Sequence, residues 1–594
     1  MSRFLEPGRM AVMAAVLALA VLPLTPISEF WITQLNFIGI SSLVALGLVL
    51  LTGIAGLTSF GQAAFVGIGA YATGYVSVVQ HMSPWLGLLA GLVVTVAFAS
   101  ALGLLTLNLS GHFLPLGTIA WGVSLYFVFG NTDAVGKYDG LVGLPPISLA
   151  GVPLDRGRSF YSFLWLVVLL ASLAISRLLD SRPGRALRAL KDGTAMPEAM
   201  GIRTFHYKLV AFLLAAVLAC VAGWLLAHYQ RTVDPSMSSM QASINYLFMA
   251  VIGGVTYIGG ALGGAALTQI LDDRLQVWLP HLIGGAGHYE GIVFGLLLVL
   301  MLQRANRGMF GVFDRWASRS RREVTPQALP RSPRAVSAEP LLRVRGLRKR
   351  FGGLLAVDGV DFDVGAGEIV GLIGPNGAGK STTFNLISGV LPPSGGTVTF
   401  DGQDISGWSA RAIARAGMGR TFQHVRMVPE MSVLENVALG AHQRGRAGVL
   451  GAVLGFDARE ERALLSEAAA HLARVGLTEY MHEPAGNLSM GSQRLLEIAR
   501  ALCTDPNILL LDEPAAGLRH SEKLALAEVL RGLRDQGMAI LLVEHDMDLV
   551  MNVTERIVVM EFGRLLMSGT PREVQASPAV RAAYLGVETE GVSA

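Results

Sequence analysis

The residues with the clearest chemistry lie in one glycine-rich run in the second half of the chain. From Gly374 to Thr382 the sequence reads Gly-Pro-Asn-Gly-Ala-Gly-Lys-Ser-Thr, after an apolar run that ends at Ile373 and before a helix-like run that begins at Thr383. This is the G-x-x-x-x-G-K-[ST] pattern in the strand–loop–helix context that its mechanism requires. In such a loop successive N–H groups converge on a phosphate, and the N-terminal end of the helix adds a positive dipole.

This phosphate loop predicts that the chain binds and hydrolyses ATP. Lys380 is expected to reach the β and γ phosphates, and the hydroxyl of Ser381 to ligate Mg²⁺. The other residues of the loop that we expect to bind nucleotide are Gly374, Asn376, Gly377, Gly379 and Thr382.

Two adjacent carboxylates follow a second apolar run. Ile508–Leu511 reads as a buried strand, and Asp512 and Glu513 come directly after it. We expect Asp512 to hold Mg²⁺, usually through water, and Glu513 to polarise the attacking water as general base.

Composition divides the chain into a membrane half and a water-soluble half. Of the 594 residues, 52% are hydrophobic and 15% charged, against about 25% charged in ordinary soluble proteins. No Lys or Arg occurs between Arg9 and Lys137. The net charge of +3 is too small to argue for a nucleic-acid partner, and the two cysteines, Cys220 and Cys503, form neither a disulfide framework nor a metal motif.

The first half, residues 1–305, is expected to be a transmembrane domain. Apolar stretches long enough to cross about 30 Å of hydrocarbon recur, and they predict eight to ten crossings. They lie near residues 10–27, 35–53, 62–80, 85–107, 113–130, 161–180, 206–228, 243–270 (broken) and 284–303. The first could also be a signal peptide, but we favour a membrane helix because further membrane segments follow at once.

Glycines are dense around residues 53–69 and 253–264. Close packing of membrane helices explains much of this pattern. The alternative is that broken segments line a pathway, since irregular backbone survives at membrane depth only where protein or water covers it. Gln62 is the polar residue that we place near such a pathway.

The distribution of basic residues predicts the orientation of the membrane half. A loop at about residues 177–208 carries Arg177, Arg182, Arg185 and Arg188, which places it in the cytoplasm with the second half of the chain. It is either an ordinary positive-inside loop or a short helix that docks on an ATPase and transmits its motion.

Residues 306–340 mix Arg, Pro and Ser without apolar periodicity, which is typical of a flexible tether. The basic concentration at Arg315–Arg334 predicts contact with anionic membrane lipid.

The membrane half resembles permeases for branched-chain amino acids. The resemblance rests on three runs in the right order, namely residues 51–71, residues 181–208 with Ser181-Arg-Pro-Gly-Arg-Ala-Leu-Arg, and residues 249–264. It implies that the loop at 177–208 is a coupling loop that docks on the ATPase.

Residues 341–594 resemble the ATP-binding-cassette (ABC) family over nearly their whole length. The resemblance implies that Phe351 stacks on adenine, although a core Phe is the alternative, and that Gln423 contacts Mg²⁺ and the transport subunit. His545, at the end of the strand Ala539–Val543, matches the switch histidine beside the γ-phosphate.

The run Leu488–Arg494 resembles the signature Leu-Ser-Gly-Gly-Gln. Ser489 and Gly491 are retained and are expected to cap a γ-phosphate, whereas Met490 and Ser492 depart from the pattern. Phe351-Gly-Gly-Leu, the run Ser432–Val437 and the tail from Pro578 to Gly586 resemble the branched-chain amino acid subfamily of these ATPases.

Together these patterns predict a multi-pass α-helical transmembrane domain followed by an α/β P-loop ABC-type nucleotide-binding domain. The resemblance implies ATP-driven import of branched-chain amino acids or related small solutes across a bacterial inner membrane. It also implies three partners: a second permease subunit, a second ATPase subunit or a second copy of this chain, and an extracytoplasmic solute-binding protein. The alternatives are an ABC exporter and a membrane-anchored regulatory ATPase without transport.

Overall fold

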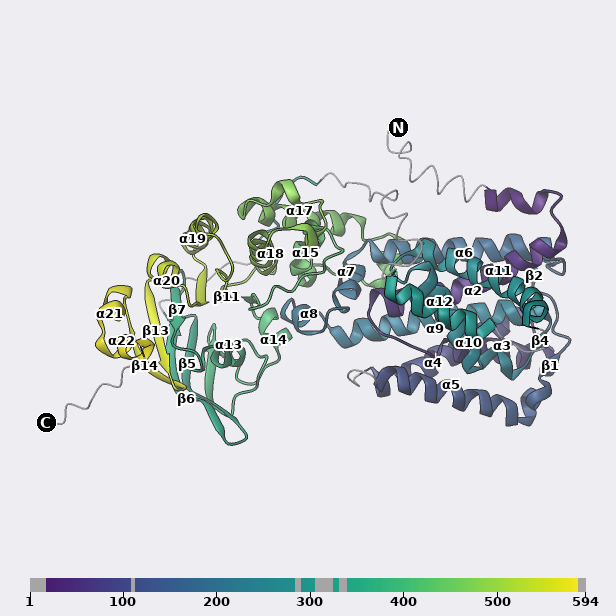
Figure 1. Cartoon of the computed structure of the whole chain (residues 1–594), viewed down its shortest axis with the longest axis horizontal. Coiled ribbons are helices and arrows are strands. Elements are labelled where there is room, and N and C mark those ends of the chain that lie inside the picture. The colour runs from purple at the N-terminus through teal and green to yellow at the C-terminus, as the bar shows by residue number, and fades with distance from the viewer. Residues whose placement is uncertain (1–17, 108–112, 284–289, 305–323, 331–338, 586–594) are drawn as a thin grey trace. The chain divides into compact units, whose positions relative to one another are not determined.

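The computed structural model describes residues 18–107, 113–283, 290–304, 324–330 and 339–585 (Figure 1). The chain forms two units that are each discontinuous in sequence. Residues 1–180 and 205–320 form a membrane unit, and residues 181–204 and 321–594 form a cassette unit. The predicted cytoplasmic loop therefore belongs to the cassette unit, not to the helices that it connects.

The membrane unit is a bundle of apolar helices (Figure 1). Its helices are α2 (Glu29–Leu48, continued by a π-helical turn, Val49–Ile54), α3 (Gln62–Gly74), α4 (Pro84–Thr106), α5 (Phe113–Asn131), α6 (Gly157–Leu179), α9 (Thr204–Gln230), α10 (Met240–Gly253), α11 (Ile258–Ile283) and α12 (Glu290–Arg304). Among the described residues, six helices are long and apolar enough to cross a membrane: residues 29–54, 62–79, 84–106, 113–131, 157–179 and 204–230. Residues 1–17, which hold eight of the eighteen residues of the first predicted span, lie outside the described residues, and the total of eight to ten crossings stays a prediction.

Burial separates central helices from peripheral ones. The apolar segment of α2 is 89% buried, whereas those of α4, α5 and α6 are only 22–28% buried. The peripheral helices therefore present large apolar side chains outward, such as Leu89, Phe127 and Leu170. A helix that is apolar on its exposed side as well as on its buried side requires lipid around it.

Glycines let α3 and α9 approach each other closely. A Cβ atom placed on Gly69 would lie 2.3 Å from the carbonyl oxygen of Cys220, and one on Gly223 would lie 2.0 Å from that of Val66. Small residues on both helices thus create a contact that larger side chains would exclude, as in membrane bundles generally.

Two interruptions in the helices lie against each other. Residues 55–61 separate the π-helical end of α2 from α3, and residues 254–257 separate α10 from α11. A Cβ atom on Gly53 would lie 1.5 Å from the carbonyl oxygen of Val255. The predicted break in the stretch 243–270 is thus observed, and protein covers it.

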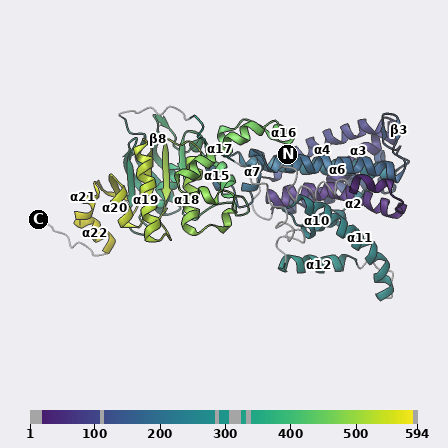
Figure 2. The same cartoon turned by 90° about the horizontal axis from the view of Figure 1, so that it is seen from above.

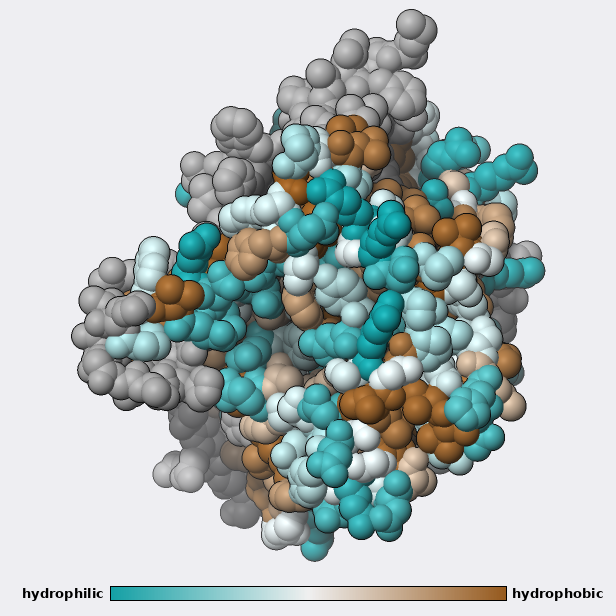
Figure 3. Space-filling model, turned by 90° about the vertical axis from the view of Figure 1, so that its right-hand side faces the viewer, coloured by the Kyte–Doolittle hydropathy of each residue, from teal (hydrophilic) through white to brown (hydrophobic). Residues whose placement is uncertain are grey.

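One end of the membrane unit carries short β-structure. The strand β1 (Leu141–Val142) pairs with β4 (Thr232–Val233), and β2 (Ser148–Leu149) pairs with β3 (Val152–Pro153), both antiparallel. Figure 3 looks onto this end, where hydrophilic side chains prevail and apolar groups form smaller patches. The mixed polarity differs from the apolar sides and suits an aqueous boundary.

The cassette unit is built on two sheets. The larger has the order β10-β11-β12-β7-β13-β14, and every pairing is parallel except that of β14. Its strands are β10 (Met418–Arg420), β11 (Ile508–Asp512), β12 (Ala539–Val543), β7 (Ile369–Ile373), β13 (Arg556–Glu561) and β14 (Arg564–Gly569). The smaller sheet is antiparallel, with the order β6 (Leu354–Val364), β5 (Leu342–Phe351), β8 (Gly395–Phe400) and β9 (Gln403–Asp404).

Alternate residues of the central strands build two separate cores. Leu509 and Leu511 of β11 pack with α15 (Val433–Ala438), α17 (Ala458–Arg474), α18 (Met490–Leu502), α19 (His520–Asp535) and α20 (Met547–Val553). Leu510 packs on the opposite face with the antiparallel sheet and α13 (Lys380–Ile387). Figure 2 looks onto the helical face, where α18, α19 and α20 are labelled. Because both faces are covered, the central strands are apolar throughout.

Candidate functional site

The predicted ATP-site residues gather where four neighbouring parallel strands end. The phosphate loop follows β7, and His545 follows β12. Asp512 is the last residue of β11 with Glu513 directly after it, and Gln423 follows β10. In open α/β sheets, ligands bind at the carboxyl ends of the strands. The topology therefore brings together residues that are up to 171 positions apart in the sequence, from Gly374 to His545.

The phosphate loop needs glycine where its backbone turns. Gly377 and Gly379 have φ of 84° and 94°, a conformation that glycine adopts readily and other residues rarely do. Lys380 begins α13 and is 5% exposed; its Nζ donates to the carbonyl oxygens of Gly374 at 2.7 Å and Pro375 at 2.9 Å. Burial lowers the pKa of Lys380, and the charge of Glu513 opposes that shift.

The remaining loop residues face outward to different degrees. Asn376, Gly377 and Ser381 are exposed and Thr382 is half-buried. Ser381 lies in the first turn of α13, so its hydroxyl is available beside the N-terminal end of that helix.

Glu513 joins the side chains predicted to act with it. Its Oε1 lies 3.1 Å from Nε2 of Gln423 and 3.2 Å from Nε2 of His545. Its φ is +48°, and its N–H donates to the carbonyl oxygen of Val543 at 2.8 Å. Positive φ at a non-glycine residue costs about 1–3 kcal/mol and is concentrated at functional positions.

Asp512 is almost buried, with an exposed fraction of 5%. Its N–H donates to Oγ1 of Thr421 at 3.2 Å. Burial raises the pKa of Asp512 to about 6, with Arg420 opposing the shift and Glu513 adding to it. Its Oδ1 has no hydrogen-bond partner among the described residues, so this oxygen has a vacant ligating position.

Three supporting residues were not predicted from the sequence. Arg420 is buried, donates to Oγ of Ser388 at 2.6 Å, and lies over the rings of Phe384 and Phe422 at 5.1 and 4.7 Å. Burial lowers its pKa to about 10. It thereby ties the strand before Gln423 to the helix of the phosphate loop.

Arg494 and Glu544 fix the other loops. Arg494 of α18 donates to the carbonyl oxygens of Phe422, at 2.8 Å, and Gln423. Glu544 is 3% exposed and accepts from the N–H groups of Ala515 at 2.6 Å and His545 at 2.9 Å. In the sequence, the only sign that these two residues support the site was their position next to predicted motifs. Arg494 ends the signature run, and Glu544 directly precedes His545.

The other predicted nucleotide residues lie away from this cluster. Phe351 ends β5, and 44% of it is exposed; the alternative that it is a core Phe is therefore wrong. Ser489 caps α18 by accepting from the N–H of Ser492 at 3.3 Å, and Gly491 lies against Glu522 of α19. The structure thus brings Gln423 and His545 into contact with Glu513. Ser489 and Gly491 lie apart from them and contact residues of α18 and α19 instead.

The cytoplasmic loop packs against other residues of the cassette unit, and we call the set of cassette residues that it contacts the docking groove. It forms α7 (Arg182–Ala189) and α8 (Ala195–Ala199). Four basic residues, spaced by three, each reach an acidic residue of the cassette: Arg182 to Glu460, Arg185 to Glu461, Arg188 to Glu435 and Lys191 to Glu430. Arg182 also donates to the carbonyl oxygens of His442 and Ala447, both at 2.6 Å.

The pair Arg185–Glu461 is the buried centre of this groove. The side chains are 2% and 8% exposed, and both terminal nitrogens of Arg185 contact Glu461, Nη2 at 3.0 Å. Removing one partner of a buried pair typically costs about 3–5 kcal/mol, because a charge is left without compensation. The outer pair Lys191–Glu430, 37% and 56% exposed, contributes far less, about 0–1 kcal/mol.

His442 makes the groove sensitive to acid. Burial, with Arg182 and Arg185 nearby, lowers the pKa of His442 to about 3, against about 6.5 in the unfolded chain. Between these values only the unfolded chain takes up the proton, so stability is lost as pH falls below about 6.5, by about 2 kcal/mol at pH 5.

We expect His442→Gln to reduce the drop in melting temperature of the detergent-solubilised protein between pH 7.5 and 5. The exposed His520, changed to Gln, is the control; an equal reduction in both variants would contradict the assignment.

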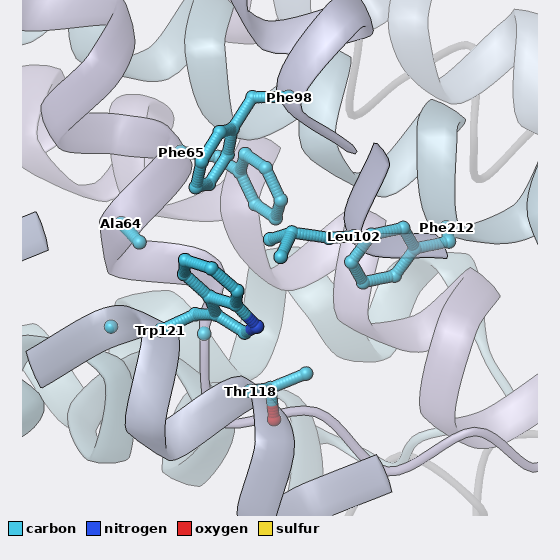
Figure 4. Close-up of a pocket in the computed structure, with 9 residues that line it drawn as sticks. Ala64, Phe65, Phe98, Leu102, Thr118, Trp121 and Phe212 are labelled. Atoms are coloured by element: carbon cyan, nitrogen blue, oxygen red, sulfur yellow. The ribbon is translucent and has the colours of Figure 1, made fainter. Parts of the chain in front are cut away.

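A small pocket lies in the membrane unit between α3, α4, α5 and α9. Phe65, Phe98, Trp121 and Phe212 supply aromatic walls, and Thr118 supplies a hydroxyl (Figure 4). Its free volume is about 10 Å³, about enough for one water molecule. Gln62 follows Gly61 of this lining and is 1% exposed, with no partner for its amide atoms among the described residues. Its place near a pathway stays a prediction.

Comparison with known proteins covers both units. Residues 357–516 match the family profile of ABC transporters, and residues 31–302 match that of the permease component of branched-chain amino acid transport systems. Residues 564–590 match the profile of branched-chain amino acid ATP-binding cassette transporters. A 252-residue stretch is 48% identical to the high-affinity branched-chain amino acid transport ATP-binding protein LivG of Salmonella typhimurium, covering 42% of this chain and 99% of that protein. This chain belongs to the branched-chain amino acid ABC transporter family.

The transporter combines a multi-pass permease and a cytoplasmic ATPase of the ABC type in one chain. A second relative, the ATP-binding protein BraF of Pseudomonas aeruginosa, is 45% identical over 252 residues, which are 42% of this chain and 99% of that protein. The ribose import ATP-binding protein RbsA 1 of Burkholderia thailandensis is 36% identical over 227 residues, 38% of this chain and 43% of that protein. The cassette thus resembles the branched-chain amino acid ATPases more than this ribose ATPase.

Proposed function

We propose that the transporter imports branched-chain amino acids or related small solutes across a bacterial inner membrane, driven by ATP. The observation that carries the proposal is the agreement of two separate regions. The permease profile over residues 31–302 and the C-terminal profile over residues 564–590 both describe branched-chain amino acid transport.

The rival functions lack such support. An exporter or a membrane-anchored regulatory ATPase would not require a permease half of the branched-chain amino acid type. A single helix is enough to anchor an ATPase, yet six described helices are long and apolar enough to span the membrane.

Uptake of radiolabelled leucine tests the proposal. We expect cells that lack this chain, and cells that carry only Lys380→Ala, to lose most ATP-dependent leucine uptake, because Lys380 is the cation that contacts the phosphates. Unchanged uptake in both would contradict leucine as substrate, and an active ATPase in the purified complex would then direct the search to other small solutes.

In the proposed ATP site, Glu513 acts as general base toward the attacking water. Its contacts with Gln423 at 3.1 Å and His545 at 3.2 Å orient the carboxylate. Lys380, the loop residues Gly374, Asn376, Gly377, Gly379 and Thr382, and the N-terminal end of α13 bind the phosphates. The exposed ring of Phe351 is proposed to stack on adenine.

The donor set fits Mg²⁺. Ser381 offers an exposed hydroxyl, Gln423 an amide oxygen, and Asp512 a buried Oδ1 without a partner among the described residues. Oxygen ligands with one carboxylate are typical of nucleotide-bound Mg²⁺. When bound, the ion would supply positive charge that neutralises the charge developing on the phosphates.

One cassette does not complete the proposed site. Ser489 and Gly491 face α18 and α19 in their own chain, so we propose that they cap the γ-phosphate held by another cassette. The partners are then a second ATPase, either another protein or a second copy of this chain, and a second permease. An extracytoplasmic solute-binding protein would supply the substrate.

We propose the domain limits as 1–305 for the permease, 306–340 for a tether and 341–594 for the cassette. Within this division, the loop at 177–208 couples ATP-driven movement of the cassette to the helices. The ion pairs of the docking groove support this role because three of the four hold the loop to α15 and α17.

A further inference from the structure

We propose that the cassette docks on the cytoplasmic loop of its own chain, and that the pair Arg185–Glu461 forms the centre of this contact. The inference rests on the proposed function, in which two permeases and two cassettes assemble. In such an assembly each cassette has two loops available, one in its own chain and one in the partner. Resemblance to the family leaves open which loop a fused cassette takes.

The first observation is the pattern of charge in the docking groove. Arg182, Arg185, Arg188 and Lys191 recur at every third residue of the loop, so they follow one side of α7 and its continuation. The acidic partners come from two separate parts of the cassette: Glu460 and Glu461 meet the first two basic residues, and Glu435 and Glu430 meet the last two. A loop with neutral or acidic residues at these places would leave Glu461 buried without compensation.

The loop and the cassette also approach each other closely at two glycines. A Cβ atom on Gly445 would lie 2.7 Å from Cδ of Arg182, and one on Gly201 would lie 2.1 Å from Nε2 of Gln443. At both glycines the loop and the cassette therefore pack closely together. Charge and shape therefore select one loop sequence, as specific interfaces do.

The second observation is where the chain joins the cassette. Residues 324–330, a described part of the segment between the permease and the cassette, lie along α17. The N–H of Gln327 donates to the carbonyl oxygen of Ser466 at 3.1 Å, and the N–H of Leu329 donates to Glu467. Arg444 links this segment to the same carboxylate, with Nη1 at 2.7 Å from Glu467 and Nη2 at 2.6 Å from the carbonyl oxygen of Pro330.

The same helix thus holds both the joining segment and the loop. Glu461 precedes Glu467 by six residues, about 9 Å along the axis at 1.5 Å per residue. Because residues 324–330 attach to α17, fewer residues separate the permease from Glu461, and this raises the effective concentration of the chain's own loop. Proximity favours this loop, and the buried pair rejects loops that do not match it.

Charge exchange tests the choice of residues. We expect Arg185→Glu and Glu461→Arg, each alone, to reduce uptake and uptake-coupled ATP hydrolysis at least tenfold. The double variant R185E/E461R, in one chain, should recover to within about threefold of the unchanged protein. Arg343→Glu, in an exposed cassette pair with Glu339, is the matched control and should change either activity less than twofold. Failure of the double variant to recover, with both singles inactive, would overturn the role of the pair.

A cross-link tests docking within one chain and needs no substrate. Nζ of Lys191 lies 3.4 Å from Oε1 of Glu430, at the accessible edge of the groove. We expect Lys191→Cys and Glu430→Cys in the same chain to be joined by a short bis-maleimide into a monomer of altered gel mobility. When the two cysteines are placed on two co-expressed chains with different tags, no cross-linked dimer should form.

The two tests separate failure of this inference from failure of the proposed function. A cross-linked dimer, or no cross-link within the doubly substituted chain, would overturn docking on the chain's own loop. Co-expressed R185E and E461R chains that regain activity would overturn it as well, because only exchanged docking restores both pairs. If leucine uptake is absent from the unchanged protein while the cross-link within one chain forms, the proposed substrate fails and the docking stands.

Discussion

Replacing Glu513 by Gln is expected to reduce steady-state ATP hydrolysis about 10²–10⁴-fold, the usual range for loss of a general base. The amide keeps the shape of the side chain, and it can still accept from Gln423, 3.1 Å away in the unchanged protein. What is lost is the carboxylate charge that takes a proton from water. Binding of ATP should persist because Lys380 and the phosphate loop are unchanged.

The measurement is phosphate release by the purified transporter together with retention of labelled ATP. Glu528→Gln, at an exposed position of α19, is the control and should hydrolyse ATP normally. Undiminished release by Glu513→Gln would remove Glu513 from the reaction.

Replacing Gly53 by Ala is expected to disrupt the membrane unit and reduce uptake at least tenfold. The added methyl group would lie 1.5 Å from the carbonyl oxygen of Val255, so the end of α2 and the break between α10 and α11 would have to separate. Overpacking against a flexible side chain costs about 1–3 kcal/mol, but here the obstacle is backbone. The exposed sides of the bundle have no part in this contact.

Uptake and limited proteolysis in membranes would check this expectation. Gly259→Ala is the matched control, since a Cβ atom there meets no atom within 4 Å. It should leave uptake intact. Normal uptake by the Gly53 variant would show that the two interruptions move apart without loss of function.

The architecture of the ATP site was predictable because its signals are local. Each motif consists of a strand pattern followed by residues of a distinct chemical type, and parallel strands align their carboxyl ends. The contacts of Glu513 with Gln423 and His545 agree with the grouping expected from motif order. Arg420, Arg494 and Glu544 escaped prediction because their partners lie 29 to 72 residues away and no local pattern marks them.

The cytoplasmic loop shows how one pattern can have two physical causes. From the sequence, the arginines of the loop predicted the orientation of the membrane half by the positive-inside rule. That rule depends only on the number of basic residues in a loop and says nothing about which residues they contact. The structure buries the Arg185 side chain, with 2% exposure, against Glu461. The three-residue spacing was visible in the sequence, but the acidic partners were not, since they come from two different parts of the cassette.

The separation between Arg185 and Glu461 also sets an order of events during synthesis. Glu461 follows Arg185 by 276 residues, and translation at roughly 5–20 residues per second makes it about 14–55 s later. Throughout that interval the loop is already at the membrane surface, and its own cassette does not yet exist. Docking of every finished cassette on the loop of its own chain would keep the cassettes of neighbouring chains away from the new loop during this interval. The order of synthesis thus gives docking within one chain a second consequence, which is protection of the unfinished transporter from the wrong cassette.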